Sequence, residues 1–241
     1  MAETILSAGL LFCGRANLTA QIREMALVVS SELQDTTALD DTSRNRLGGL
    51  KDVSFSAAGY FAAAEPDLTI YIDLGVADTL ITVAPTTTLG DRSYFFRAVL
   101  GEYSPIGGAV GEVAGFSLNA SAYADGLIRG TLMENGSFLV TGNGTGRQLG
   151  AVGSTQRIYA GLHITAITGT WTIALESDDN AGFTTATTRA TFASNTAETL
   201  SNNAADLFTS VVGAITDDYW RFRFTEDVAG TITLAASLGI Q

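Results

Sequence analysis

The stretch Val53–Phe61 (VSFSAAGYF) decides the fold class, because its residues alternate in size and polarity at every second position. Side chains of a β-strand point in turn to its two faces. Val53, Phe55 and Phe61 would therefore share one face, and Ser54 and Ser56 the other. This period of two predicts a half-buried strand.

Comparable strand patterns recur along the whole chain. They cover Thr79–Ala84, Tyr94–Leu100, Val110–Ala120, Leu127–Leu132, Tyr159–Thr168, Trp171–Leu175, Trp220–Phe224 and Thr231–Leu238. One segment, Glu65–Gly75, favours a short helix, because Pro66 and two acids open it and a glycine follows it. Short strands with turns between them are typical of β-sandwiches and small barrels. The sequence therefore predicts a mainly β protein with one short helix.

Composition restricts the classes of function. The chain has 241 residues, 46% of them hydrophobic and 16% charged, so it can bury a substantial core. Its net charge of −12 repels phosphate and disfavours tight nucleic-acid binding. Cys13 is the single cysteine, which excludes a disulfide framework within one chain. The apolar run Ile5–Cys13 lacks a basic start, and we expect neither export nor a membrane span.

The common catalytic patterns are missing. His163 is the only histidine and falls within a strand pattern, where a hydrogen-bonded structural role is the usual one. The acidic pairs Asp40-Asp41, Asp178-Asp179 and Asp217-Asp218 fit turns better than a glycosidase pair or a calcium loop. Glycines at 142, 144 and 146 do not follow the dinucleotide-binding spacing. We therefore expect a protein that is not an enzyme and that binds no metal or cofactor.

Two irregular segments divide the chain. Thr141–Gly146 is a small polar run that predicts a boundary between a domain of residues 1–140 and a second domain of residues 141–241, although a hairpin within one domain would look the same. Residues 31–50 form a long segment with four acids, two arginines and few large apolar side chains. A loop of this length usually serves a function. We interpret it as an arm that contacts another subunit.

The residues from Leu33 to Phe61 resemble the N-terminal part of siphophage tail-tube proteins. The resemblance rests on the order of an acidic, Thr-rich loop, two arginines, the turn Gly49–Asp52 and the closing Gly59–Phe61. It continues through Arg92–Leu100 and Gly111–Ser117, and the C-terminal segments Thr145–Ile167 and Ala214–Arg221 are similar to a second domain found in the same group. One departure is Gly48, where relatives often have proline.

The resemblance implies a tail-tube-type β-sandwich or barrel with a helix on one side and a long loop, followed by a C-terminal β-sandwich domain. It also implies hexameric rings stacked into a tube in the virion, assembled in the host bacterial cytoplasm with a tape measure and a tail terminator. DNA would pass through without specific binding. The expected subunit contacts lie in the loop and just after it: Glu32, Asp35, Asp40, Asp41, Arg44, Arg46, Lys51 and Asp52.

Two other functions compete with this interpretation. A carbohydrate-binding or adhesion module would use exposed aromatic residues, for which Trp171, Trp220, Phe222 and Phe224 are the candidates. Their alternation with polar residues favours core packing instead. A capsid decoration protein is the third possibility, and it differs mainly in symmetry.

Overall fold

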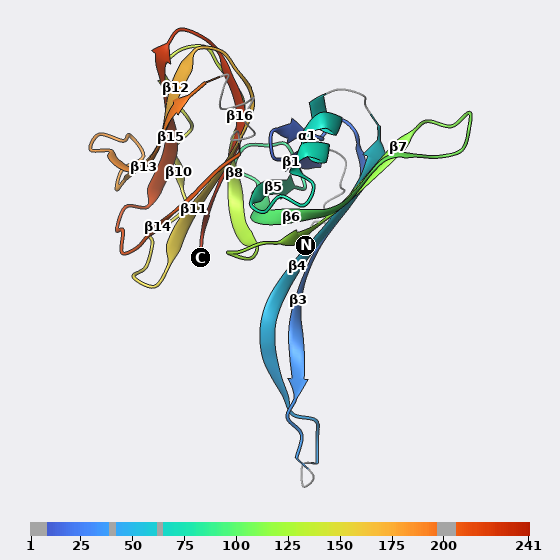
Figure 1. Ribbon diagram of the computed structural model, residues 1–241. Helices are drawn as coiled ribbons and strands as arrows, with labels where there is room; N and C mark the ends of the chain where they lie inside the picture. The colour runs from blue at the N-terminus through green and yellow to red at the C-terminus, as the bar shows by residue number, and fades with distance from the viewer. Residues whose placement is uncertain (1–8, 39–41, 62–64, 197–205) are drawn as a thin grey trace.

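The computed structural model describes residues 9–38, 42–61, 65–196 and 206–241 and is mainly β (Figure 1). One helix, α1 (Glu65–Asp73), is present in these ranges. The strands before it are β1 (Leu10–Cys13), β2 (Ala16–Asn17), β3 (Ile22–Asp35) and β4 (Arg46–Tyr60). Those of the middle are β5 (Thr79–Ala84), β6 (Arg92–Gly107), β7 (Gly115–Ala122), β8 (Ile128–Phe138), β9 (Gly142–Asn143) and β10 (Arg147–Gln148). The last six are β11 (Arg157–Ile167), β12 (Thr170–Asp178), β13 (Thr187–Asn195), β14 (Asp206–Val212), β15 (Tyr219–Val228) and β16 (Ile232–Ile240).

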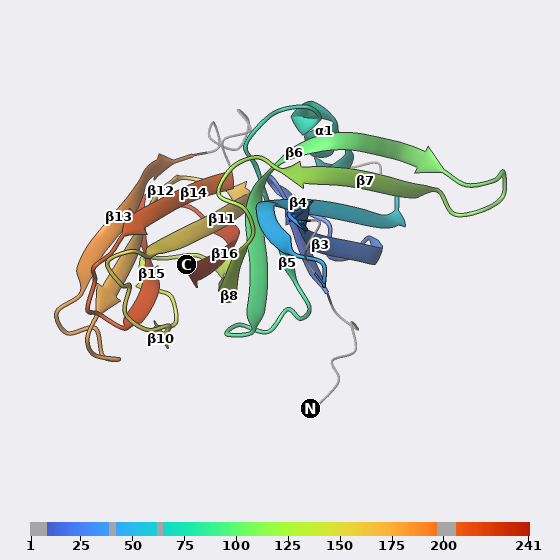
Figure 2. The ribbon, with the colours of Figure 1, turned by 90° about the horizontal axis from the view of Figure 1, so that it is seen from below.

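The strands form two antiparallel sheets. The larger sheet has the order β14-β11-β16-β8-β6-β5-β1-β2, and β6 also carries a branch in which β7, β4 and β3 follow one another outward. The smaller sheet has the order β10-β15-β12-β13, with β9 beside β15. Figures 1 and 2 show two lobes, one built mainly from the strands before residue 140 and the other from those after it.

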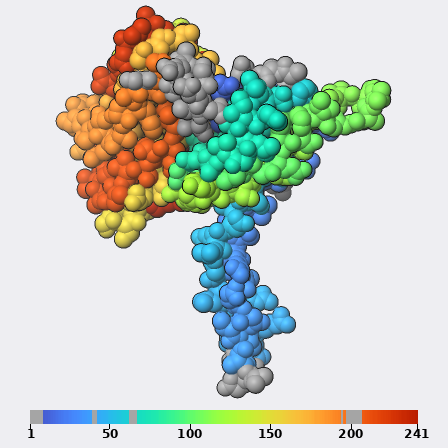
Figure 3. Space-filling model, in the orientation of Figure 1, coloured from blue at the N-terminus to red at the C-terminus, as the bar shows by residue number. Residues whose placement is uncertain are grey.

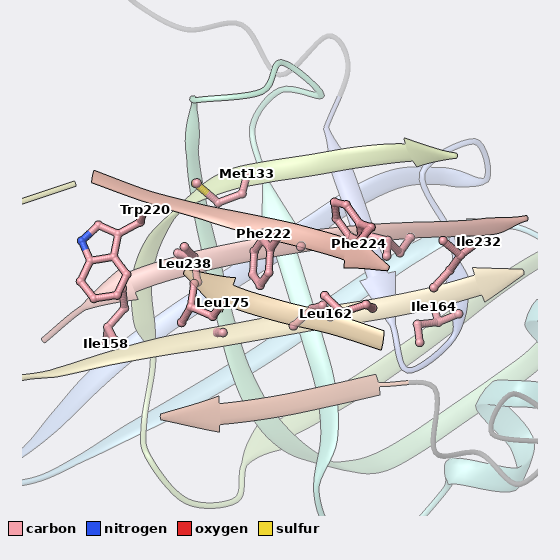
Figure 4. Close-up of a cluster of buried hydrophobic side chains, with 14 of the residues drawn as sticks. Met133, Ile158, Leu162, Ile164, Leu175, Trp220, Phe222, Phe224, Ile232 and Leu238 are labelled. Carbon is pink, nitrogen blue, oxygen red and sulfur yellow. The ribbon is translucent and has the colours of Figure 1, made fainter. Parts of the chain in front are cut away.

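The C-terminal lobe is a sandwich whose core is aromatic. Trp171, Trp220, Phe222 and Phe224 are all fully buried, and they pack against aliphatic side chains of β11 and β16. Figure 4 shows Phe222, Phe224 and Leu162 within this cluster of buried side chains. This cluster removes a large apolar area from water, which is the main stabilising term for such a lobe.

The N-terminal lobe has its own core. The inward residues of β4 and β7, among them Phe55 and Leu118, pack against β1, β5 and the inner side of α1, where Ile70 is buried. Helix α1 covers this lobe because Thr69, Ile70 and Asp73 face inward at helical spacing. The helix predicted at Glu65–Gly75 is therefore confirmed, as is the mainly β class.

The segment of residues 31–50 differs from its expectation as an irregular loop. Ser31–Asp35 continues β3 and Arg46–Leu50 belongs to β4, and the two are paired from Asp35 opposite Arg46 onward. The result is a long β-hairpin that projects from the lobe (Figures 1 and 3). The sequence did not predict these strands, because both of their faces are exposed and no alternation of apolar residues marks them.

Strand β8 links the two lobes by backbone hydrogen bonding. Its start pairs with β6, where Thr131 lies opposite Arg92, and its length pairs with β16. The larger sheet thus runs through both lobes without a break in the ladder. The division into domains at about residue 140 remains a prediction.

Candidate functional site

His163 is buried and fully hydrogen-bonded. Its Nδ1 lies 2.6 Å from the carbonyl oxygen of Gly14 and its Nε2 lies 2.7 Å from the hydroxyl of Thr82. Since a carbonyl only accepts, Nδ1 carries the proton. Burial keeps the imidazole neutral, so Nε2 accepts from the hydroxyl of Thr82. The ring also stacks on Phe12 at 5.3 Å between centroids. His163 therefore ties β11 to β1 and β5, which is a structural role.

We expect this histidine to make stability depend on pH. Burial lowers the pKa of His163 to about 4, so the unfolded chain binds a proton that the folded chain excludes. Its stabilising contribution is complete above pH 6.5 and is lost as the pH falls towards 4, by about 2 kcal/mol between pH 7.5 and 5. Urea unfolding of the wild type and of His163→Gln at both pH values measures this change in the free energy of unfolding.

The comparison with His163→Gln is needed because Asp73, beside Gly14, has the opposite effect. Burial raises the pKa of Asp73 to about 6, against the nearby Arg15, so this group adds stability as the pH falls from 6 towards 4. Both proteins contain Asp73, so its effect cancels in their difference. The stability advantage of the wild type over the variant should shrink at pH 5, and an advantage that stayed constant would contradict the assignment.

The acidic pairs that the structure describes serve turns and ion pairs. Asp178 accepts hydrogen bonds from the backbone N–H groups of Asn180 and Thr185 and so closes the turn after β12. Asp217 accepts from Ser177 and forms an ion pair with Arg189 at 2.8 Å. In the described ranges no group of three or more histidine, cysteine or acidic side chains is arranged to hold a metal ion.

The aromatic candidates for sugar binding are not available at the surface. Trp171, Trp220, Phe222 and Phe224 each have no exposed area, and the indole N–H groups of both tryptophans are bonded to backbone carbonyls inside the protein. The interpretation of these residues as core is therefore confirmed. A carbohydrate platform built from them is excluded.

The branch β3-β4-β7-β6 forms a four-stranded antiparallel sheet with two open margins. β3 pairs with β4 alone among the described strands, and the second half of β6 pairs with β7 alone, apart from one bridge from Leu74 to Leu100. Exposed strand margins are a liability in a lone protein, because they template pairing with another chain. The pattern of a single sequence does not show which distant strands pair, as β4 and β7 do here.

The hydrogen bonds fix which backbone groups face each margin. The N–H of Tyr60 donates to the carbonyl of Gln21, just before β3, so the backbone N–H and C=O groups of the even-numbered residues of β4 face β3. The same groups of their partners Ala26 and Val28 therefore face β4. The groups of Met25, Leu27 and Val29 consequently point outward. By the same alternation, those of Tyr103 and Pro105 point away from β7. Proline without an N–H is typical of an edge.

One face of this sheet is polar and made of small side chains. Its residues form three rows across the strands: Glu24, Ala58, Ser117 and Ser104; Ala26, Ser56, Asn119 and Glu102; Val28, Ser54 and Ser121. Two shallow depressions follow these rows. The side-chain amide of Asn119 donates to Glu102 at 3.0 Å, and Arg23 lies at the border over the ring of Tyr60. The opposite face is the apolar one that covers the core.

We name the hairpin of Val28–Asp35 and Arg46–Val53, with the turn between its strands, the arm. Six of the expected contact residues lie exposed on it: Glu32, Asp35, Arg44, Arg46, Lys51 and Asp52. Asp40 and Asp41 fall outside the described residues. The arm also exposes large apolar side chains that sequence reasoning did not single out: Val28, Val29, Leu33, Leu47 and Leu50.

The charged residues that the structure describes on the arm make local contacts. Asp35 lies opposite Arg46 in the ladder, and hydrogen bonds from the hydroxyl and N–H of Thr37 lower the pKa of Asp35. Asp52 caps the N–H of Val53, and Glu32 accepts from Gln34. These are local contacts within an exposed strand pair. The described residues of the arm therefore form an exposed surface.

No family model and no curated protein matches this chain. Among solved structures it is similar to a chain of the virion of a native gene transfer agent particle, with 22% identity, a TM-score of 0.41, and coverage of 50% of this chain and 93% of that one. It is also similar to the tube-terminating cap of the anti-feeding prophage, with 10% identity, a TM-score of 0.42, and coverage of 54% and 93%.

A third similar structure is the SPP1 Dit protein, described as a hub of the adsorption apparatus of phages that infect Gram-positive bacteria. It has 10% identity and a TM-score of 0.37, with coverage of 97% of this chain and 99% of that one. These neighbours are components of phage tails and related particles. Their TM-scores lie below 0.5, so the likeness does not establish a shared function. No helix in the described ranges is long and apolar enough to cross a membrane.

Proposed function

We propose that this chain is a non-enzymatic structural subunit of a phage-type tail tube, in which copies form rings that stack around a channel for DNA. The observation that carries the proposal is the four-stranded sheet with an open margin on each side. β3 and β6 are its outermost strands, and they run in opposite directions because the four strands alternate. Placing β6 of one copy beside β3 of the next continues an antiparallel sheet around a ring.

A closed sheet of six copies, the number that the resemblance implies, would be wide enough for DNA. Six four-stranded sheets give about 24 strands spaced roughly 4.8 Å apart, which means a backbone-to-backbone diameter of at least about 37 Å. Subtracting small side chains leaves a bore wide enough for a DNA duplex. Three copies would give only about 18 Å between backbones, which is too narrow.

The polar face suits the wall of such a channel. The strand rows that define it contain Glu24 and Glu102 but no lysine or arginine, and most of the others are serine, alanine or asparagine. Phosphate groups gain no ion pairs from these rows, and the two carboxylates repel them; Arg23 lies at their border. DNA would slide along it without sticking. The apolar face then turns outward to the core of each protomer.

This function places the protein in the virion, after assembly in the host bacterial cytoplasm. Its partners would be copies of itself and other tail proteins such as a tape measure and a tail terminator. The expected contact residues Glu32, Asp35, Arg44, Arg46, Lys51 and Asp52 lie on a projecting arm, which suits contact with a neighbouring ring.

Electron microscopy of the concentrated purified protein tests the proposal. We expect rings with an open bore and, at higher concentration, tubes. Trimers without an open bore would favour a capsid decoration protein. A protein that remained monomeric at every concentration would count decisively against a tube subunit.

A further inference from the structure

The outward side of α1 and the turn after it form an apolar surface that needs a cover. Leu68, Tyr71, Ile72, Leu74 and Val76 are each between 39% and 68% exposed, although they lie within nine consecutive residues. The inward side of the helix is already covered by the core of its lobe, where Ile70 is buried. An outward side that is also apolar normally requires a cover of its own. A continuous exposed patch of this kind marks an interaction site. We call these five residues the α1 patch.

The charge around the α1 patch has one sign. Residues 65–78 contain Glu65, Asp67, Asp73 and Asp78 and no basic residue. Arg97 forms an ion pair with Asp78 at 2.9 Å and Arg15 lies near the buried Asp73, so two of the four charges are offset from outside the segment. Asp67 accepts a hydrogen bond from the neutral hydroxyl of Tyr103, which leaves its charge in place.

The arm carries the complementary surface. Residues 44–51 contain Arg44, Arg46 and Lys51 and no acid. Between them stand Leu47, which is 64% exposed, and Leu50, which is 83% exposed. This strand of the arm is thus basic and apolar, although the paired strand carries Glu32 and Asp35, with Asp35 opposite Arg46. The α1 patch is acidic and apolar. Complementary charge selects the partner and the register, and the apolar side chains supply the area that is buried.

We propose that residues 44–51 of the arm bind the α1 patch of a second copy in the adjacent ring. The arm and α1 lie at opposite ends of the protomer, so one chain does not bring them together (Figure 1). Two different surfaces at opposite ends form a head-to-tail contact, which repeats without closing and builds a tube. This inference rests on the proposed function and adds to it the partner surface that receives the arm.

Carbodiimide cross-linking of the wild-type protein tests this contact. The reagent joins a lysine amine directly to a carboxylate, and Lys51 is the only lysine in the chain. In assembled tubes we expect a covalent dimer in which the Lys51 peptide is joined to a peptide of residues 65–78, identified by mass spectrometry. Lys51→Arg keeps the charge and should assemble, but it should lose this product. Links made by the N-terminal amine are distinguished by mass.

A second measurement uses the apolar part of the contact. Tyr71→Glu should lower the yield of sedimented tubes about tenfold, because it places a charge in the buried contact, while rings still form. Val228→Glu, at an exposed apolar position of the other lobe, should leave the yield unchanged. Tubes that form but give no link from Lys51 to residues 65–78, or that tolerate Tyr71→Glu, would overturn this inference alone. Absence of any assembly by the wild type would instead refute the tube function and this contact with it.

Discussion

Replacing Gln34–Leu47 by Asn-Gly should leave a folded protomer that forms rings and no tubes. Leu33 lies opposite Gly48, so the two-residue turn closes the shortened hairpin at a natural pair. The removed residues that the structure describes are exposed and belong to no core cluster, so folding should cost little. The variant loses Arg44, Arg46 and Leu47, which are the proposed contacts to the next ring.

Circular dichroism and thermal unfolding establish that this variant is folded, and electron microscopy then compares its assemblies with those of the wild type. As a control, Thr37→Ala alters the arm without shortening it or removing a proposed contact residue. It should form tubes of normal length. Tubes formed by the shortened variant would show that the arm does not stack the rings.

Val29→Pro should prevent ring formation altogether. The N–H of Val29 points away from β4, so proline there removes a donor at the open margin and leaves the β3–β4 hydrogen bonds in place. Its side chain is half exposed, which limits the loss of packing. In the proposed ring this N–H would pair with β6 of the neighbouring copy. We expect a folded monomer by analytical ultracentrifugation at concentrations at which the wild type assembles.

Two neighbouring substitutions make this result specific. Val29→Thr retains the N–H group and the branched shape, and it should assemble. Val28→Pro removes an N–H that faces β4 and should destabilise the hairpin itself, because a hydrogen bond of the β3–β4 ladder is lost. Rings formed by Val29→Pro would mean that this margin of β3 does not join the copies.

The sequence predicted the elements that are buried on one face. Val53–Phe61 and Trp220–Phe224 alternate because one side of each strand enters a core, and the helix at Glu65 is marked by its termini. The first strand, Leu10–Cys13, is buried on both sides. Such a strand reads as a short apolar run without a period, which sequence alone does not distinguish from other apolar segments.

The position of the candidate contact segment in the chain could be predicted from the sequence, but its hairpin structure could not. The charges of residues 31–50 indicated contact with another subunit, yet strands that are exposed on both faces lack the period that would identify them. The open margins depend on the pairing of β4 with β7, which joins two hairpins that are far apart in the chain. The neutral state of His163 likewise depends on Gly14 and Thr82, which the fold brings from other strands.

Hydrogen exchange at the backbone amides of Met25, Leu27 and Val29 tests the central claim most directly. These N–H groups face the open margin of β3 and should exchange rapidly in the isolated protomer. In assembled rings they should become protected by about a hundredfold or more, because strand β6 of the next copy accepts their hydrogen bonds. Amides that exchange equally fast in both states, or that are already protected in the lone protomer, would contradict closure of the sheet between copies.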